Sequence, residues 1–196
     1  METLFDRLYH ELQAGQPAVL LTVVASQGST PRGIGSHQAV FADGTTAGTV
    51  GGGYQEYLAI QAGKQCLAQQ QSAFRRLILH PNDEEDINAA CGGELTVFCQ
   101  YLDPAEPGLL DLLSVILQAL RQQTASWLAL DVSDERQWGM ALVREGAVQG
   151  CGQMGCPGTG RGCTRLRPDG LLAGCRCRLV PAERSRHGRR RPAPLV

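Results

Sequence analysis

The sequence predicts an α/β fold in which a mixed β-sheet is flanked by helices and followed by an irregular basic tail. Helical periodicity alternates with short apolar runs along the first 150 residues. The apolar runs are rich in β-branched residues and are bounded by Gly, Pro and Asp, as strands are. Interleaved strands and helices pack in layers around one core. We therefore expect one folded domain over residues 1–150 and a tail over 151–196.

Three segments have the apolar spacing of helices. Residues 2–13 place four apolar side chains on one face: Leu4, Phe5, Leu8 and Leu12. Residues 54–69 place four residues roughly in line: Tyr54, Leu58, Ala62 and Cys66. Residues 109–123 have the strongest helical pattern of the three. Each helix is expected to cover the sheet with its apolar face.

The strand predictions rest on short apolar or alternating runs. Residues 18–25 are nearly all apolar, which predicts a strand buried on both faces. Residues 37–42 and 45–50 bracket Asp43-Gly44, a strong hairpin signal. Further strands are expected at 74–80, at 94–102 and as three short runs within 126–150. Four residues of the 94–102 strand should share one face: Leu95, Val97, Cys99 and Tyr101.

Charge and cysteine content divide the chain in the same place. Residues 1–150 carry seven Arg, one Lys and 17 acidic residues, whereas residues 151–196 carry ten Arg and two acidic residues. A basic tail is typical of nucleic-acid binding, and spaced cysteines are typical of zinc sites. The cysteines lack paired C-x2-C knuckles, however, and the tail lacks a core-forming pattern. The abrupt change instead indicates a shifted reading frame or a degenerate end, and we expect no nucleic-acid partner.

The sequence also predicts where the protein works. No apolar run approaches the roughly 20 residues that a membrane span needs. Residues 1–13 lack the basic start and apolar centre of a signal peptide. We expect a cytoplasmic protein without a membrane partner.

Two glycine-rich stretches, GSTPRGIG and GTVGGG, are candidates for anion binding. Gly51, Gly52 and Gly53 separate a predicted strand from a predicted helix, where backbone N–H groups and the helix dipole favour negative charge. The alternative is a tight turn that needs positive φ. Arg32 is either an anion clamp in a glycine loop or a solvated charge. Glu56 lies in the first helical turn, where a carboxylate also stabilises the helix dipole.

Cys91 precedes Gly92 and Gly93 at the start of a predicted strand. A thiol presented there is suited to act as a nucleophile, a persulfide carrier or a soft metal ligand, whereas most single cysteines are buried and structural. Cys66 and Cys99 fall on apolar faces and are expected to be buried. His80 is a candidate base for Cys91, but no third member of a Cys/His hydrolase site is visible.

Three blocks in order, GSTPRGIG, ADGTTAGTVGGGYQE and AACGGELTVF, resemble the XdhC/CoxI family of molybdenum-enzyme maturation proteins. The resemblance covers residues 18–102. It implies a catalytic role for Cys91 and assigns no metal ligand. It implies cofactor binding by nine further residues: Gly28, Ser29, Arg32, Gly51, Gly52, Gly53, Glu56, Gly92 and Gly93.

The resemblance implies an accessory protein rather than an enzyme. Such a chaperone binds the molybdenum cofactor (molybdopterin) transiently, helps it to acquire its terminal sulfur and delivers it to a xanthine dehydrogenase-type hydroxylase. A cysteine desulfurase as sulfur donor and a homodimer are further expectations from the family.

Two departures from the family pattern leave alternatives open. Many members have Cys where this chain has Tyr54, so Cys91 is the remaining candidate thiol. Family members also continue into a Rossmann-like domain, of which only GCGQMGCPGTG near residue 150 is recognisable here. The alternatives are a non-functional remnant and a Rossmann-type NAD(P)-binding oxidoreductase. The second lacks the acidic residue expected after a glycine-rich turn.

Overall fold

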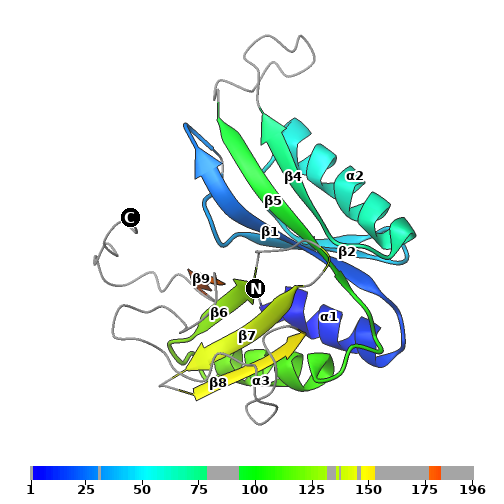
Figure 1. Ribbon diagram of the computed structural model, residues 1–196, viewed down its shortest axis with the longest axis vertical. Coiled ribbons are helices and arrows are strands. Elements are labelled where there is room, and N and C mark those ends of the chain that lie inside the picture. The colour runs from blue at the N-terminus through cyan, green and yellow to red at the C-terminus, as the bar shows by residue number, and fades with distance from the viewer. Residues whose placement is uncertain are drawn as a thin grey trace.

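The computed structural model describes residues 2–30, 32–78, 93–131, 136, 138–144, 147–152 and the backbone of 177–181. The helices of these residues are α1 (Glu2–Gln13), α2 (Gly53–Gln69) and α3 (Leu109–Arg121) (Figure 1). The strands are β1 (Ala18–Gln27), β2 (His37–Phe41), β3 (Thr46–Gly48), β4 (Ala73–Ile78), β5 (Glu94–Leu102), β6 (Trp127–Asp131), β7 (Gly139–Arg144), β8 (Ala147–Gly152) and β9 (Cys177–Pro181). The predicted α/β class is confirmed.

The strands form two sheets, and every strand pairing among the described residues is antiparallel. The first sheet has the order β3-β2-β1-β5-β4, and the second has the order β8-β7-β6-β9. The sheets are antiparallel rather than mixed, and most of their neighbouring strands, such as β1 with β2 and β6 with β7, are consecutive in the chain and reverse direction between them. The central β1–β5 pair joins segments about 75 residues apart, and a sequence pattern does not encode their relative direction.

The hairpin predicted at Asp43-Gly44 joins β2 to β3. Phe41 N donates to the Thr45 carbonyl oxygen at 3.0 Å, and Gly44 N donates to the Phe41 carbonyl oxygen at 2.9 Å. Asp43 Oδ1 accepts from Thr45 N at 2.9 Å, which closes an Asx-type turn. The local signal was sufficient because the contacts of this turn lie within five residues.

One apolar core lies between the first sheet and α2, which covers one face of that sheet (Figure 1). Cys66 and Cys99 are 1% and 0% exposed within it, which confirms their predicted burial. The predicted common face of β5 is also confirmed, since all four residues belong to this core: Leu95, Val97, Cys99 and Tyr101.

A second core lies on the other side of the first sheet and includes α1, α3 and the second sheet. The four apolar residues predicted for α1 are all buried there: Leu4, Phe5, Leu8 and Leu12. Strand β1 contributes to both cores, Val19 and Leu21 to the first and Ala18 and Leu20 to the second. Its predicted burial on both faces is therefore confirmed.

The buried face of α2 differs from the prediction at two of its four residues, because Tyr54 and Leu58 are not buried. Tyr54 is 42% exposed, whereas Gln55 is 2% exposed. The face toward the sheet consists of Gln55, Ala59, Ala62, Gly63 and Cys66. The prediction gave weight to the large apolar ring of Tyr54, but small residues at this face let the helix approach the sheet closely.

The second sheet extends beyond residue 150. Strand β8 ends at Gly152, and Cys151 is buried with 2% exposure. The backbone of Cys177–Pro181, a segment assigned from sequence to the irregular tail, forms β9 and pairs with β6. This pairing satisfies backbone groups that an edge strand leaves open. Among the described residues, no helix is both long and apolar enough to cross a membrane.

Candidate functional site

The three sequence blocks meet at one end of the strands of the first sheet. In the antiparallel register Gln27, at the end of β1, is opposite Glu94, at the start of β5, and Glu94 is opposite Ile78, at the end of β4. Gln38, near the start of β2, is opposite Gly48, at the end of β3. The loop after β1, the turn after β3 and the start of β5 therefore share this end of the strands, which we call the motif edge (Figure 1).

The loop after β1 is held by its own backbone. Gly35 N donates to the Val23 carbonyl oxygen at 2.9 Å, and the Thr30 hydroxyl donates to the Arg32 carbonyl oxygen at 3.0 Å. Gly28 has a φ of 73°, in the left-handed region. The Arg32 side chain is exposed, and its guanidinium makes no hydrogen bond or ion pair within the described part of the chain. Within the described residues, Arg32 is thus an exposed cation without a side-chain partner.

Gly93 joins the third block to the first. A Cβ on Gly93 would collide with the Ser29 carbonyl oxygen and lie 2.8 Å from Thr30 Cγ2. Only glycine permits this approach, which holds the start of β5 against the loop that carries Arg32. Cys91 and Gly92, together with Pro31 and His80, lie outside the described residues.

The turn from β3 to α2 is organised by Thr49. Its backbone N–H donates to the His37 carbonyl oxygen at 3.0 Å. Its hydroxyl lies 2.7 Å from the Gly51 carbonyl oxygen and contacts a carboxylate oxygen of Glu56. Glu56 is therefore engaged within the turn. This arrangement favours the role of a carboxylate that fixes the strand-to-helix connection.

The start of α2 retains capacity for an anion. Gly52 is the N-cap, is extended (φ −167°, ψ 166°) and supplies no side-chain cap. The first amides of a helix have no intrahelical acceptor, so Gly53 and the following residues offer N–H donors and the positive end of the dipole. The other carboxylate at the motif edge, Glu94, is paired with Arg76 at 2.6 Å, which lowers the pKa of Glu94.

Sequence reasoning missed two tyrosines at the motif edge. Tyr54 and Tyr57 are 42% and 55% exposed, and their rings stack with centroids 6.0 Å apart and planes 19° apart. Ile34 and Ile78 are also exposed at this edge. The available signal was the i, i+3 spacing of two aromatic residues at the start of a helix, which places them on one face.

A buried polar pair lies at the start of β2. His37 is 5% exposed, and its Nδ1 lies 3.0 Å from Thr22 Oγ1. Burial lowers the pKa of the His37 imidazole from 6.5 to about 4, so the ring is neutral at physiological pH. In the part of the chain that the structure describes, no group of three or more His, Cys, Asp or Glu residues is arranged to hold a metal ion.

Comparison with known proteins agrees with the resemblance seen in the sequence. Residues 11–78 match the XdhC and CoxI family. The chain is 33% identical over 82 residues to the uncharacterized protein YqeB of Escherichia coli K12, which covers 42% of this chain and 15% of YqeB. A crystal structure of a xanthine dehydrogenase from Bacillus halodurans superimposes with a TM-score of 0.60 and 21% identity, over 78% of this chain and 46% of that one. At this identity the superposition establishes the fold, and the chain spans less than half of either protein.

Proposed function

We propose, from the match of residues 11–78 to the XdhC and CoxI family, that this chain is an accessory protein for the maturation of xanthine dehydrogenase-type molybdenum enzymes. On this proposal the motif edge binds the molybdenum cofactor, a planar pterin with a phosphate and a dithiolene-bound metal. The client enzyme is a xanthine dehydrogenase-type hydroxylase, and a cysteine desulfurase supplies the sulfur. The observation that carries the proposal is the convergence of all three sequence blocks at this edge.

The residues of the motif edge fit an anionic ligand. Arg32 is exposed and unpaired among the described residues, and the start of α2 has no side-chain cap. Among the described residues of this edge, the two carboxylates that would repel an anion are engaged, Glu94 by Arg76 and Glu56 by Thr49. An arginine fork and helix N-terminal amides are both common phosphate ligands.

The same edge fits a planar ring. The exposed faces of Tyr54 and Tyr57 offer aromatic surface for stacking, and they lie directly after the glycines of the turn. Bound molybdenum cofactor would supply the metal and the dithiolene sulfurs. The chain itself would bind the phosphate, orient the ring and shield one side of it from water.

We expect Arg32→Ala to weaken cofactor binding by about 1.5–3 kcal/mol, roughly 10- to 150-fold, because one charge-assisted hydrogen bond is lost. Molybdenum cofactor released anaerobically from a purified molybdenum hydroxylase would be mixed with the protein. Retained pterin would then be measured after gel filtration. Lys64→Ala, which removes an exposed charge from α2, is the matched control and should bind as the wild type does. Equal retention by the Arg32 variant would refute the clamp.

The proposal assigns the reactive thiol to Cys91. Brief alkylation of the native protein should label Cys91 faster than Cys66 and Cys99, because these two thiols are 1% and 0% exposed. Bound cofactor should protect Cys91, and peptide mapping would identify each labelled site. Cys91→Ser should fold normally and lose cofactor retention or sulfur loading. Slow labelling of all three thiols, with normal retention by Cys91→Ser, would assign Cys91 a packing role.

A further inference from the structure

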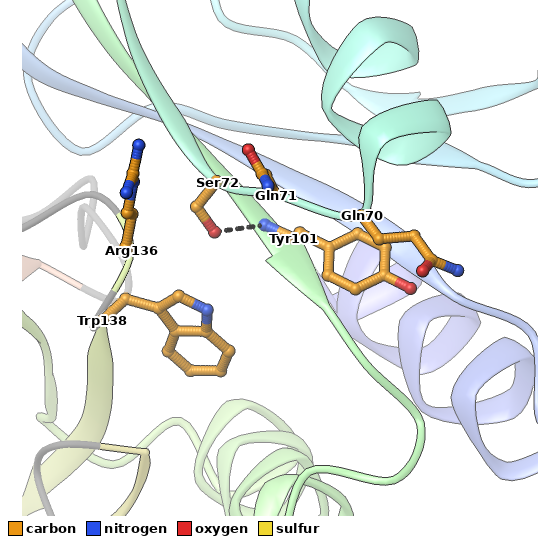
Figure 2. Close-up of a pocket in the computed structure, with 6 residues that line it drawn as sticks. All are labelled: Gln70, Gln71, Ser72, Tyr101, Arg136 and Trp138. Carbon is orange, nitrogen blue, oxygen red and sulfur yellow. Dashed lines mark hydrogen bonds between the residues drawn. The ribbon is translucent and has the colours of Figure 1, made fainter.

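A pocket of about 360 Å³ lies at the other end of the strands of the first sheet, away from the motif edge. Its walls come from the segment between α2 and β4, from the end of β5 and from residues just before β7 (Figure 2). The lining residues are Gln70, Gln71, Ser72, Tyr101, Arg136 and Trp138. Small-molecule sites commonly have volumes of roughly 300–1,000 Å³ and lie between packed units. This pocket lies between residues of the first sheet and residues that lead into the second.

Ser72 supplies a buried polar group to the pocket. It is 8% exposed, and its Oγ accepts a hydrogen bond from Tyr101 N at 2.9 Å. Figure 2 shows this bond within the pocket. A hydroxyl that accepts from the backbone still has one proton to donate, and buried donors are normally satisfied. The described residues provide no acceptor for this proton, so Ser72 is prepared to donate to a bound molecule.

Gln70 occupies a backbone conformation that favours glycine. As the residue after α2 it has φ 53° and ψ 39°, in the left-handed region. Glycine is the usual residue at this position, because a side chain there is strained. Gln123 has the same conformation, with a φ of 52°, after α3, so this conformation belongs to the helix end, and Gln70 bears on the pocket through its place in the wall. The amide of Gln70 offers both a donor and an acceptor beside the pocket.

Two half-buried aromatic side chains line the pocket. Gly152 packs so closely on Trp138 that a Cβ there would lie 2.5 Å from the Trp138 carbonyl oxygen and 3.4 Å from Trp138 Cε3. A side chain at position 152 would therefore disturb the backbone that carries Trp138. Burial, with a smaller effect of Asp103, raises the pKa of Tyr101, so its hydroxyl is a donor at neutral pH.

The charges around the pocket favour one orientation of a bound ligand. Arg136 is the charged residue among the six, and Figure 2 places it across the pocket from Gln70. The Gln70 end adjoins the C-terminus of α2, where the helix dipole is negative and favours donors on a ligand. An anionic group would therefore lie at the Arg136 end.

We propose that this pocket binds a planar nitrogen heterocycle that carries an anionic group. The ring packs against Trp138, the polar ring atoms meet Gln70 and Ser72, and the anion pairs with Arg136. Nucleotides and pterins with an acidic substituent share this chemistry. The site is separate from the motif edge and does not depend on the function proposed for that edge.

The chain has two tryptophans, which gives a direct test. In Trp127→Phe protein the indole of Trp138 is the sole reporter. We expect saturable fluorescence quenching by GMP or by pterin-6-carboxylate, and the stronger quencher identifies the source of the heterocycle. Guanosine should bind at least tenfold more weakly than GMP, and inorganic phosphate should not quench. The reciprocal Trp138→Phe protein, which reports from the exposed Trp127, should show no saturable quenching.

Two further variants separate binding from folding. Gln70→Gly should raise the melting temperature by about 2–4 °C, because it relieves the left-handed strain. The same change should lower the affinity for the probe at least fivefold. Arg136→Ala should weaken it at least tenfold, because a charge-assisted contact is lost, whereas Lys64→Ala should not. The proposal is overturned if neither heterocyclic anion quenches Trp138 saturably. It is equally overturned if Gln70→Gly and Arg136→Ala bind the probe as tightly as the Trp127→Phe parent.

Discussion

Gly48→Ala is expected to lower the free energy of unfolding by about 2–5 kcal/mol. Gly48 has a φ of 79°, where a side chain costs about 1–2 kcal/mol. A Cβ there would also lie 2.5 Å from Leu4 Cδ1 and 2.6 Å from the His37 carbonyl oxygen. The backbone oxygen cannot move without disturbing the β2–β3 pair, so overpacking adds about 1–3 kcal/mol. Thermal unfolding should show a decrease in melting temperature of about 4–20 °C.

Gly15→Ala is the matched control for Gly48→Ala. Gly15 has nearly the same conformation, with a φ of 76°, but a Cβ there would meet no atom within 4 Å. Its replacement should therefore cost only the conformational strain, about 1–2 kcal/mol. If the two variants lost the same free energy of unfolding, the close contacts of residue 48 with α1 and β2 would not add to the cost of a side chain there.

The second large expected effect is a loss of stability at acidic pH. The folded-state pKa of His37 is about 4, below its ordinary value of 6.5, so the unfolded chain binds more protons between these values. The contribution of His37 to stability is therefore complete above pH 6.5 and falls as the pH falls toward 4, by about 3 kcal/mol in total. Urea unfolding from pH 7 to pH 4 should show this loss in the wild type and not in His37→Gln.

The difference between the two proteins isolates His37 from the carboxylates that titrate in the same range. His10→Gln is the control for the replacement of a histidine as such, because the His10 side chain is 66% exposed on α1. A pH dependence that is identical in wild type and His37→Gln would show that the ring is protonated without opening the core.

Much of the fold could be predicted from the sequence where the contacts are local. The buried face of α1, the Asp43-Gly44 hairpin and the common face of β5 each depend on a period or a turn within a few residues. The direction of β1 against β5 could not be predicted, because the alternation of side chains is the same in parallel and antiparallel pairs.

The candidate site could be predicted only in part, because its motifs are local but its arrangement depends on distant segments of the chain. The glycine blocks indicated which segments matter, and the register of the sheet brings them together. The engagement of Glu56 by Thr49 and the exposure of Tyr54 depend on the rotation of α2 about its axis, which small residues at its buried face determine. The pocket around Trp138 was not predicted, because its residues come from three separate segments of the chain.

The pairing of β1 with β5 contains an irregularity that governs which changes of chain length the motif edge tolerates. Val23 is opposite Val97 and Ala25 is opposite Thr96, so Val24 is an extra residue, a β-bulge. Beyond it the alternation of faces is inverted, and Ser26 shares the α2 side of the sheet with Leu95. A deletion of Val24 would leave Ala25 opposite Thr96 and Gln27 opposite Glu94, so it would remove the bulge without moving the loop after β1 relative to Gly93. A deletion between Ala25 and Gly28 would instead shorten the paired end of β1 and pull that loop away from Gly93. The bulge is therefore a place in β1 where the chain can lose one residue while the register at the motif edge is kept.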